Sequence, residues 1–152
     1  MAESLTSSKQ NKSRYGDKRE DPSGADGIAY GRGETVLLAE KNANLLKLGI
    51  SLLIQLNYKV IAARNEAQVI EHCLDRPREI DLLILDTSIS GMSADNILRK
   101  IRACQPRAKA IFYSTLDWQI NPDLRRMFGH FPVMSKPFSI RDFSRIIDLT
   151  LH

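Results

Sequence analysis

The stretch Ile80-Asp81-Leu82-Leu83-Ile84-Leu85-Asp86 decides the fold. Its apolar run between two aspartates is too short for a membrane span and suits a strand buried on both faces of a parallel sheet. The polar, turn-prone run from Thr87 to Ser93 cannot continue that strand. Asp86 therefore falls at the carboxyl end of a buried strand, where ligands bind on open α/β sheets.

The bulk composition is that of a soluble globular domain, with 43% hydrophobic and 26% charged residues among 152. No apolar run approaches the about 20 residues of a membrane helix, and the N-terminus lacks a secretory signal pattern, so we expect a cytoplasmic protein without a membrane partner. Lys and Arg exceed Asp and Glu by 6 to 5 in residues 1–33 and by 16 to 13 in residues 34–152. This even spread argues against direct DNA binding, which needs a clustered basic face.

Residues 1–33 are rich in Ser, Lys, Asp, Gly and Arg and nearly lack large apolar side chains. Such a segment cannot bury enough surface to offset the entropy of ordering it. We therefore predict a disordered polar tail over 1–33 and one folded domain over 34–152. The two cysteines have no metal or redox spacing, so they are expected to be reduced thiols.

Five apolar runs alternate with five helical patterns after the tail. The expected strands are residues 35–39, 58–63, 80–85, 108–113 and 131–135, the last at a sheet edge because it contains Pro132. The expected helices start after the caps Asn42 or Asn44, Asn65, Asn121 and Ser139, and at Ala94. Their inward faces are predicted to carry Leu45, Leu46, Gly49, Ile50, Leu53 and Leu56; Val69, Ile70, Cys73 and Leu74; Ile97, Leu98 and Ile101; and Ile140, Phe143, Ile147 and Leu151. This alternation predicts a doubly wound parallel sheet in a three-layer αβα fold.

Polar residues follow four of the predicted strands. Glu40 and Lys41 follow the first, Asp86 the third, Ser114 the fourth and Lys136 the fifth. In a doubly wound sheet these ends share one edge. A carboxylate at that edge can accept a phosphoryl group as a mixed anhydride, and an ammonium and a hydroxyl can hold the phosphoryl oxygens. The pattern thus indicates phosphoryl transfer to Asp86.

Residues 34–152 resemble the receiver domain of two-component response regulators. The resemblance rests on Val36-Leu37-Leu38-Ala39-Glu40-Lys41, Asp81 to Asp86, Gly91-Met92, Ser114 and Lys136-Pro137-Phe138. It implies the flavodoxin-like fold of the chemotaxis regulator, with sheet order 2-1-3-4-5. It also implies that Asp86 is the phospho-acceptor, that the Ser114 hydroxyl and the Lys136 ammonium contact the phosphoryl group, and that the chain is a signalling domain and not an independent enzyme.

The resemblance further implies a Mg²⁺ site formed by Glu40, Asp86 and the backbone carbonyl of Ser88. The family normally has two acidic residues after the first strand, and here Lys41 replaces the second. A lysine there repels a cation and could pair with Asp86 instead, which would weaken or abolish metal binding. A register slip of one residue, placing Glu40 at the direct position and Ala39 at the other, is the alternative.

Other positions also depart from the family pattern. Val133 stands where a switch aromatic is usual, and Thr115 is larger than the residue usual beside the phosphoryl path. Two hypotheses follow. The first is a single-domain receiver in a phosphorelay, which takes the phosphoryl group from a histidine kinase or phosphotransfer protein and signals to a downstream protein by contact. The second is a phosphorylation-independent pseudo-receiver that acts as an interaction module. The last helix could also pair two protomers, as in some receivers.

Overall fold

The fold is built on five parallel strands. The computed structural model describes residues 26–87, 89, 94–114, 131–135 and 139–152. The strands are β1 (Thr35–Ala39), β2 (Lys59–Ala63), β3 (Leu82–Asp86), β4 (Lys109–Ser114) and β5 (Val133–Ser135). They form one sheet in the order β2-β1-β3-β4-β5, with every pair parallel. The expected flavodoxin-like sheet order is thereby confirmed, and β5 lies at an edge as predicted.

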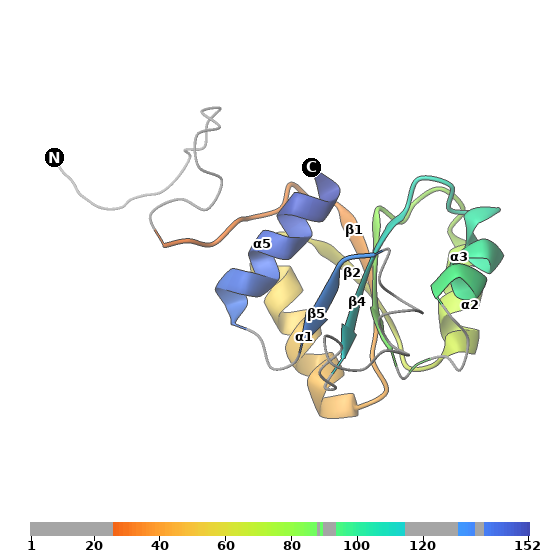
Figure 1. Cartoon of the computed structure of the whole chain (residues 1–152), viewed down its shortest axis with the longest axis horizontal. Coiled ribbons are helices and arrows are strands. Elements are labelled where there is room, and N and C mark those ends of the chain that lie inside the picture. The colour runs from red at the N-terminus through yellow and green to blue at the C-terminus, as the bar shows by residue number, and fades with distance from the viewer. Residues whose placement is uncertain (1–25, 88, 90–93, 115–130, 136–138) are drawn as a thin grey trace, which may run out of the picture.

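Helices cover both faces of the sheet. They are α1 (Ala43–Gln55), α2 (Glu66–Asp75), α3 (Ala94–Arg102) and α5 (Ile140–Leu151). Figure 1 shows α1 and α5 on one face and α2 and α3 on the other, which is the predicted three-layer arrangement. The short helix expected after Asn121 lies outside the described residues. No helix of the described part of the chain is long and apolar enough to cross a membrane.

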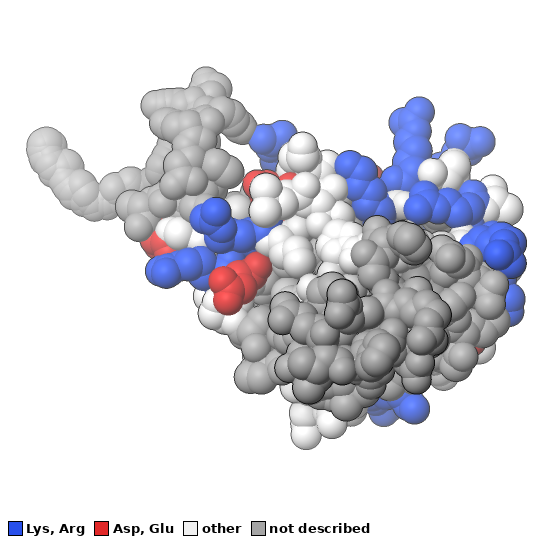
Figure 2. Space-filling model, in the orientation of Figure 1, with Lys and Arg blue, Asp and Glu red and all other residues white. Residues whose placement is uncertain are grey.

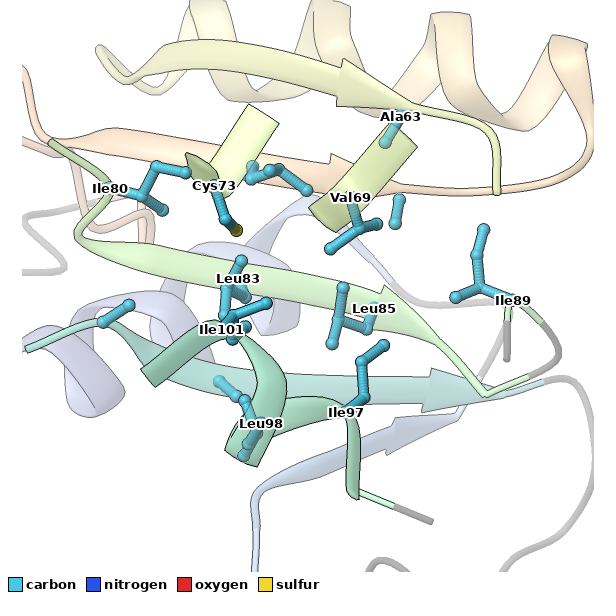
Figure 3. Packing of buried hydrophobic residues seen from close by; sticks show 14 of the residues in the cluster. Ala63, Val69, Cys73, Ile80, Leu83, Leu85, Ile89, Ile97, Leu98 and Ile101 are labelled. Atoms are coloured by element: carbon cyan, nitrogen blue, oxygen red, sulfur yellow. The ribbon is translucent and has the colours of Figure 1, made fainter. Parts of the chain in front are cut away.

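Successive side chains of each strand point to opposite faces of the sheet, so the core consists of two clusters, one on each face. On the α1/α5 side, β3 contributes Leu82 and Ile84; on the α2/α3 side it contributes Leu83 and Leu85. Figure 3 shows the second cluster, in which Val69 and Cys73 of α2 and Ile97, Leu98 and Ile101 of α3 pack together with Leu83 and Leu85 of β3. All five residues of β3 are buried, as its continuous apolar sequence predicts.

The start of β3 differs from the prediction. The strand begins at Leu82, not Ile80, and the buried Ile80 N–H donates to the Gln105 side-chain oxygen at 3.1 Å. The Gln105 amide nitrogen donates to the carbonyls of Cys73 (2.9 Å) and Arg76. Gln105 is 1% exposed, so one buried amide fastens the chain that enters β3 to the end of α2.

Helix starts were predicted more accurately than helix faces. The side chains of Asn42, Asn65 and Ser139 accept hydrogen bonds from the first turns of α1, α2 and α5, which decides for Asn42 over Asn44. Leu45 and Leu74 were expected to face inward, but they are 42% and 61% exposed. Each lies about 100° around its helix from a buried neighbour, at the border of the apolar stripe.

Residues 26–33, which we call the N-terminal strap, pack against the domain. Ala29 is 1% exposed, and its N–H donates to the Ser144 hydroxyl on α5 at 3.0 Å. The Gly31 N–H donates to the Leu56 carbonyl at 2.7 Å, and a Cβ at Gly31 would collide with the Tyr58 ring. The packed part of the chain thus begins before residue 34, the predicted boundary. Residues 1–25 lie outside the described residues.

Candidate functional site

Two carboxylates meet at the carboxyl edge of the sheet. Asp86 is the last residue of β3, and Glu40 directly follows β1. Ala39 pairs with Leu85, so Glu40 stands level with Asp86 on the neighbouring strand. Glu40 is 2% and Asp86 7% exposed, a burial that carboxylates tolerate only with compensating partners. Glu40 and Asp86 therefore lie at the same level of two neighbouring strands.

The backbone after Asp86 turns away from the sheet. The Asp86 carbonyl accepts a hydrogen bond from the Ile89 N–H at 2.9 Å, and the Thr87 N–H donates to the Tyr113 carbonyl at 2.9 Å. Ile89 returns to the core with 8% exposure. This turn ends β3 at the acid, as the change from apolar to polar sequence predicted.

Glu40 is held by two hydrogen bonds among those described. Its Oε1 accepts from the Tyr113 hydroxyl at 2.8 Å, and its Oε2 accepts from the Asn42 N–H at 3.0 Å. The Asn42 side chain also caps α1, accepting from the N–H groups of Asn44 and Leu45. The start of α1 and the end of β4 therefore fix this carboxylate together.

Tyr113 is a site residue that the sequence analysis missed. It lies in β4 in register with Asp86 and is 5% exposed. Burial raises the pKa of the Tyr113 hydroxyl, and the negative charge of Glu40, the hydrogen bond to Glu40 and the charge of Asp86 raise it further. The hydroxyl is thus a neutral donor at physiological pH. Its signal in the sequence was a polar ring end within a buried strand, which requires a partner.

Lys41 does not pair with Asp86. Its side chain is exposed, and no ion pair joins these two residues, both of which lie in the described part of the chain. The Lys41 carbonyl accepts a hydrogen bond from the Arg64 guanidinium at 3.1 Å, which fastens the loop after β1 to the end of β2. The hypothesis that the Lys41 ammonium substitutes for a cation against Asp86 is therefore not supported by this geometry.

Only two of the other predicted site residues, Ser114 and Val133, lie in the described part of the chain. Ser114 ends β4, and its backbone pairs with Ser135, the residue before Lys136. Val133 begins β5 and packs, half-buried, against the α2/α3 cluster. Ser88, Thr115 and Lys136 lie outside the described residues.

Basic side chains gather around the last turn of α3. Figure 2 shows Lys and Arg clustered at the upper right, on the side where α3 lies in Figure 1. The last turn of α3 carries Arg99, Lys100 and Arg102, and no Asp or Glu occurs in residues 96–116. The positive charge is thus less evenly distributed than the count over the two parts of the chain suggested.

Comparison with known proteins identifies the fold. No protein-family model matches the chain, and no curated protein matches it either. Among solved structures, a response regulator receiver domain protein from Clostridium thermocellum is 22% identical, with a TM-score of 0.65 over 78% of this chain and 94% of that one. The chain has the fold of response regulator receiver domains.

Two further receiver-fold structures are informative. The receiver domain of a sensor histidine kinase from Pseudomonas aeruginosa, with a magnesium ion coordinated in its active-site cleft, is 21% identical, with a TM-score of 0.64 over 79% of this chain and 98% of that one. The structure of the P1 domain of CheA3 in complex with CheY6 from R. sphaeroides matches at 23% identity, with a TM-score of 0.61 over 79% of this chain and 98% of that one.

The donor groups at the carboxyl edge fit a magnesium ion. Mg²⁺ prefers oxygen ligands and is commonly held by one or two carboxylates together with waters and phosphate oxygens. Glu40 and Asp86 supply two carboxylates at adjacent strand ends. The described residues contain no group of three or more His, Cys, Asp or Glu side chains that could hold a metal. A cation here would therefore depend on this pair and on oxygens from outside the described residues.

Proposed function

We propose that the chain is a receiver domain that accepts a phosphoryl group on Asp86 and signals by protein contact. The observation that carries the proposal is the position of Asp86, a buried carboxylate that ends the central strand of a receiver fold. Glu40, level with it on β1, supports the proposal because a second carboxylate suits a cation that would offset the charge of a phosphoryl group.

The chemistry is a simple displacement. A carboxylate oxygen of Asp86 attacks the phosphorus atom of a phosphohistidine donor, a new oxygen–phosphorus bond forms, and the phosphorus–nitrogen bond breaks. The bonding electrons leave with the donor nitrogen, and nothing is oxidised or reduced. In this proposal Ser114 and Lys136 hold the phosphoryl oxygens. Glu40, Asp86 and the Ser88 carbonyl would hold Mg²⁺, which supplies positive charge for the transferred group.

The surface beside the site suits contact with a second protein. Leu45 and Leu48 of α1 are 42% and 55% exposed, and α1 begins directly after the loop that carries Glu40. Exposed apolar side chains next to a reacting group offer contact area to a second protein. A histidine kinase or phosphotransfer protein in the cytoplasm is the partner we propose, with a downstream protein as the target.

The test is phosphorylation in solution. Wild-type protein incubated with acetyl phosphate and Mg²⁺ should gain one phosphoryl group by intact mass. Asp86→Asn should gain none, because an amide cannot form the mixed anhydride. Circular dichroism of both proteins checks that the substitution leaves the fold intact. Absence of any gain in the wild type, or an equal gain in Asp86→Asn, would contradict the proposal and favour the pseudo-receiver.

A further inference from the structure

Two tyrosines lie buried in the α1/α5 cluster, and their hydroxyls differ. Tyr58, at 4% exposure, has a hydroxyl without a hydrogen-bond partner within the described part of the chain. Tyr113, at 5% exposure, donates to Glu40 Oε1 at 2.8 Å, and its oxygen lies 3.4 Å from the Ala39 carbonyl. The two rings are similarly buried, and only the Tyr113 hydroxyl donates to Glu40. Removing each hydroxyl in turn therefore separates the loss of a buried hydroxyl from the loss of this hydrogen bond.

The Tyr113 side chain crosses the strand that carries Asp86. Tyr113 belongs to β4 and Glu40 follows β1, and β3 lies between those two strands in the sheet. Tyr113 is in register with Asp86, so the phenol reaches over the acceptor strand at the level of the acceptor itself. A single side chain of β4 therefore reaches the Glu40 carboxylate beyond β1 on the far side of β3.

We propose that Tyr113 is a positioning residue for Glu40, fixing that carboxylate in the orientation in which it holds a cation beside Asp86. The inference rests on the proposed function, because it takes the Glu40–Asp86 pair as the Mg²⁺ site. Tyr113 engages one carboxylate oxygen and the Asn42 N–H engages the other, which defines the plane of the group. A carboxylate oxygen has two lone pairs, so a hydrogen bond to one of them is compatible with coordination of a cation by the same group.

The expected effect follows from the behaviour of groups that orient metal ligands. Removing such a group typically weakens metal affinity by about 10–100-fold. Tyr113→Phe keeps the ring and deletes only the donor, so Glu40 keeps the Asn42 contact but loses its fixed orientation. Tyr58→Phe is the matched control, because it deletes a buried hydroxyl that holds nothing in the described part of the chain.

The experiment measures Mg²⁺ affinity of the full chain by isothermal titration calorimetry for wild type, Tyr113→Phe and Tyr58→Phe. We expect the dissociation constant of Tyr113→Phe to rise about tenfold or more, and that of Tyr58→Phe to stay within about twofold of wild type because no ligand is released. Phosphorylation by acetyl phosphate is then measured at Mg²⁺ concentrations that saturate each protein. If Tyr113→Phe is phosphorylated as well as wild type at saturating Mg²⁺, the hydroxyl acts through the cation and not through the stability of the fold.

Failure of the inference and failure of the proposed function give different results. Equal Mg²⁺ affinity of the two phenylalanine variants, or no Mg²⁺ binding by wild type, would overturn the role of Tyr113. If wild type is phosphorylated in either case, the proposed function stands. If Tyr113→Phe weakens Mg²⁺ binding while no protein accepts a phosphoryl group, the positioning role stands and the proposed function fails.

Discussion

Replacing Gln105 by leucine should destabilise the protein by about 3 kcal/mol. Leucine nearly keeps the side-chain volume, so the loss is mainly that of hydrogen bonds. An unpaired buried donor costs about 1–3 kcal/mol, and each of two carbonyls that loses its partner adds about 0.5–1.5 kcal/mol. The donor is the Ile80 N–H, and the carbonyls are those of Cys73 and Arg76. Burial of the apolar leucine side chain offsets about 1 kcal/mol of this loss.

The assay is urea unfolding followed by far-ultraviolet circular dichroism. At a slope of about 1.5 kcal/mol per molar urea, the midpoint should fall by about 2 M. Gln55→Ala, at the exposed end of α1, is the control and should change the free energy of unfolding by less than about 0.5 kcal/mol. A loss below about 1 kcal/mol for Gln105→Leu would refute the view that this amide fastens the entry to β3.

Three further outcomes are expected. Lys41→Asp should tighten Mg²⁺ binding about tenfold, because one repelling charge becomes an oxygen ligand; unchanged affinity in calorimetry would show that Lys41 lies outside the range of the cation. Ser139→Ala should cost about 1 kcal/mol in urea unfolding through loss of the α5 cap, and a neutral effect would contradict the capping role. Burial, with the nearby Cys104 thiol, raises the pKa of the Cys73 thiol to about 12. The thiolate population of Cys73 is therefore negligible at pH 8 and rises only as the pH approaches that value. Iodoacetamide at pH 8 should modify the half-buried Cys104 first and Cys73 only after unfolding, so equal rates by peptide mass would count against this assignment.

Local sequence was sufficient to predict the sheet and the position of Asp86 at the end of β3. The apolar run before Asp86 is buried along its whole length, and the stripe Ile97, Leu98 and Ile101 faces the core as its spacing indicates. Such features depend on periodicity within one element, which a sequence displays directly. Leu45 and Leu74 were misassigned because apolar character alone does not define where the buried stripe of a helix ends.

The interactions that no local pattern displays connect distant parts of the chain. Tyr113 meets Glu40 across 73 residues, and Ala29 of the N-terminal strap meets Ser144 across 115. Gln105 stands before Pro106 and would ordinarily be assigned to a solvated turn. Each of these contacts requires the register between strands or the packing of loops, so it becomes visible only once the three-dimensional arrangement is known.

The register between β3 and β4 limits where this chain can change length. Because side chains alternate between the two faces of a strand, inserting or deleting one residue inside β4 would turn the Tyr113 ring toward α2 and α3. Such a shift would separate the phenol from Glu40 even if every residue type were retained. Length variation in related chains is therefore expected in the turn around Pro106, whereas the interval from Ala108 to Ser114 should keep a constant number of residues.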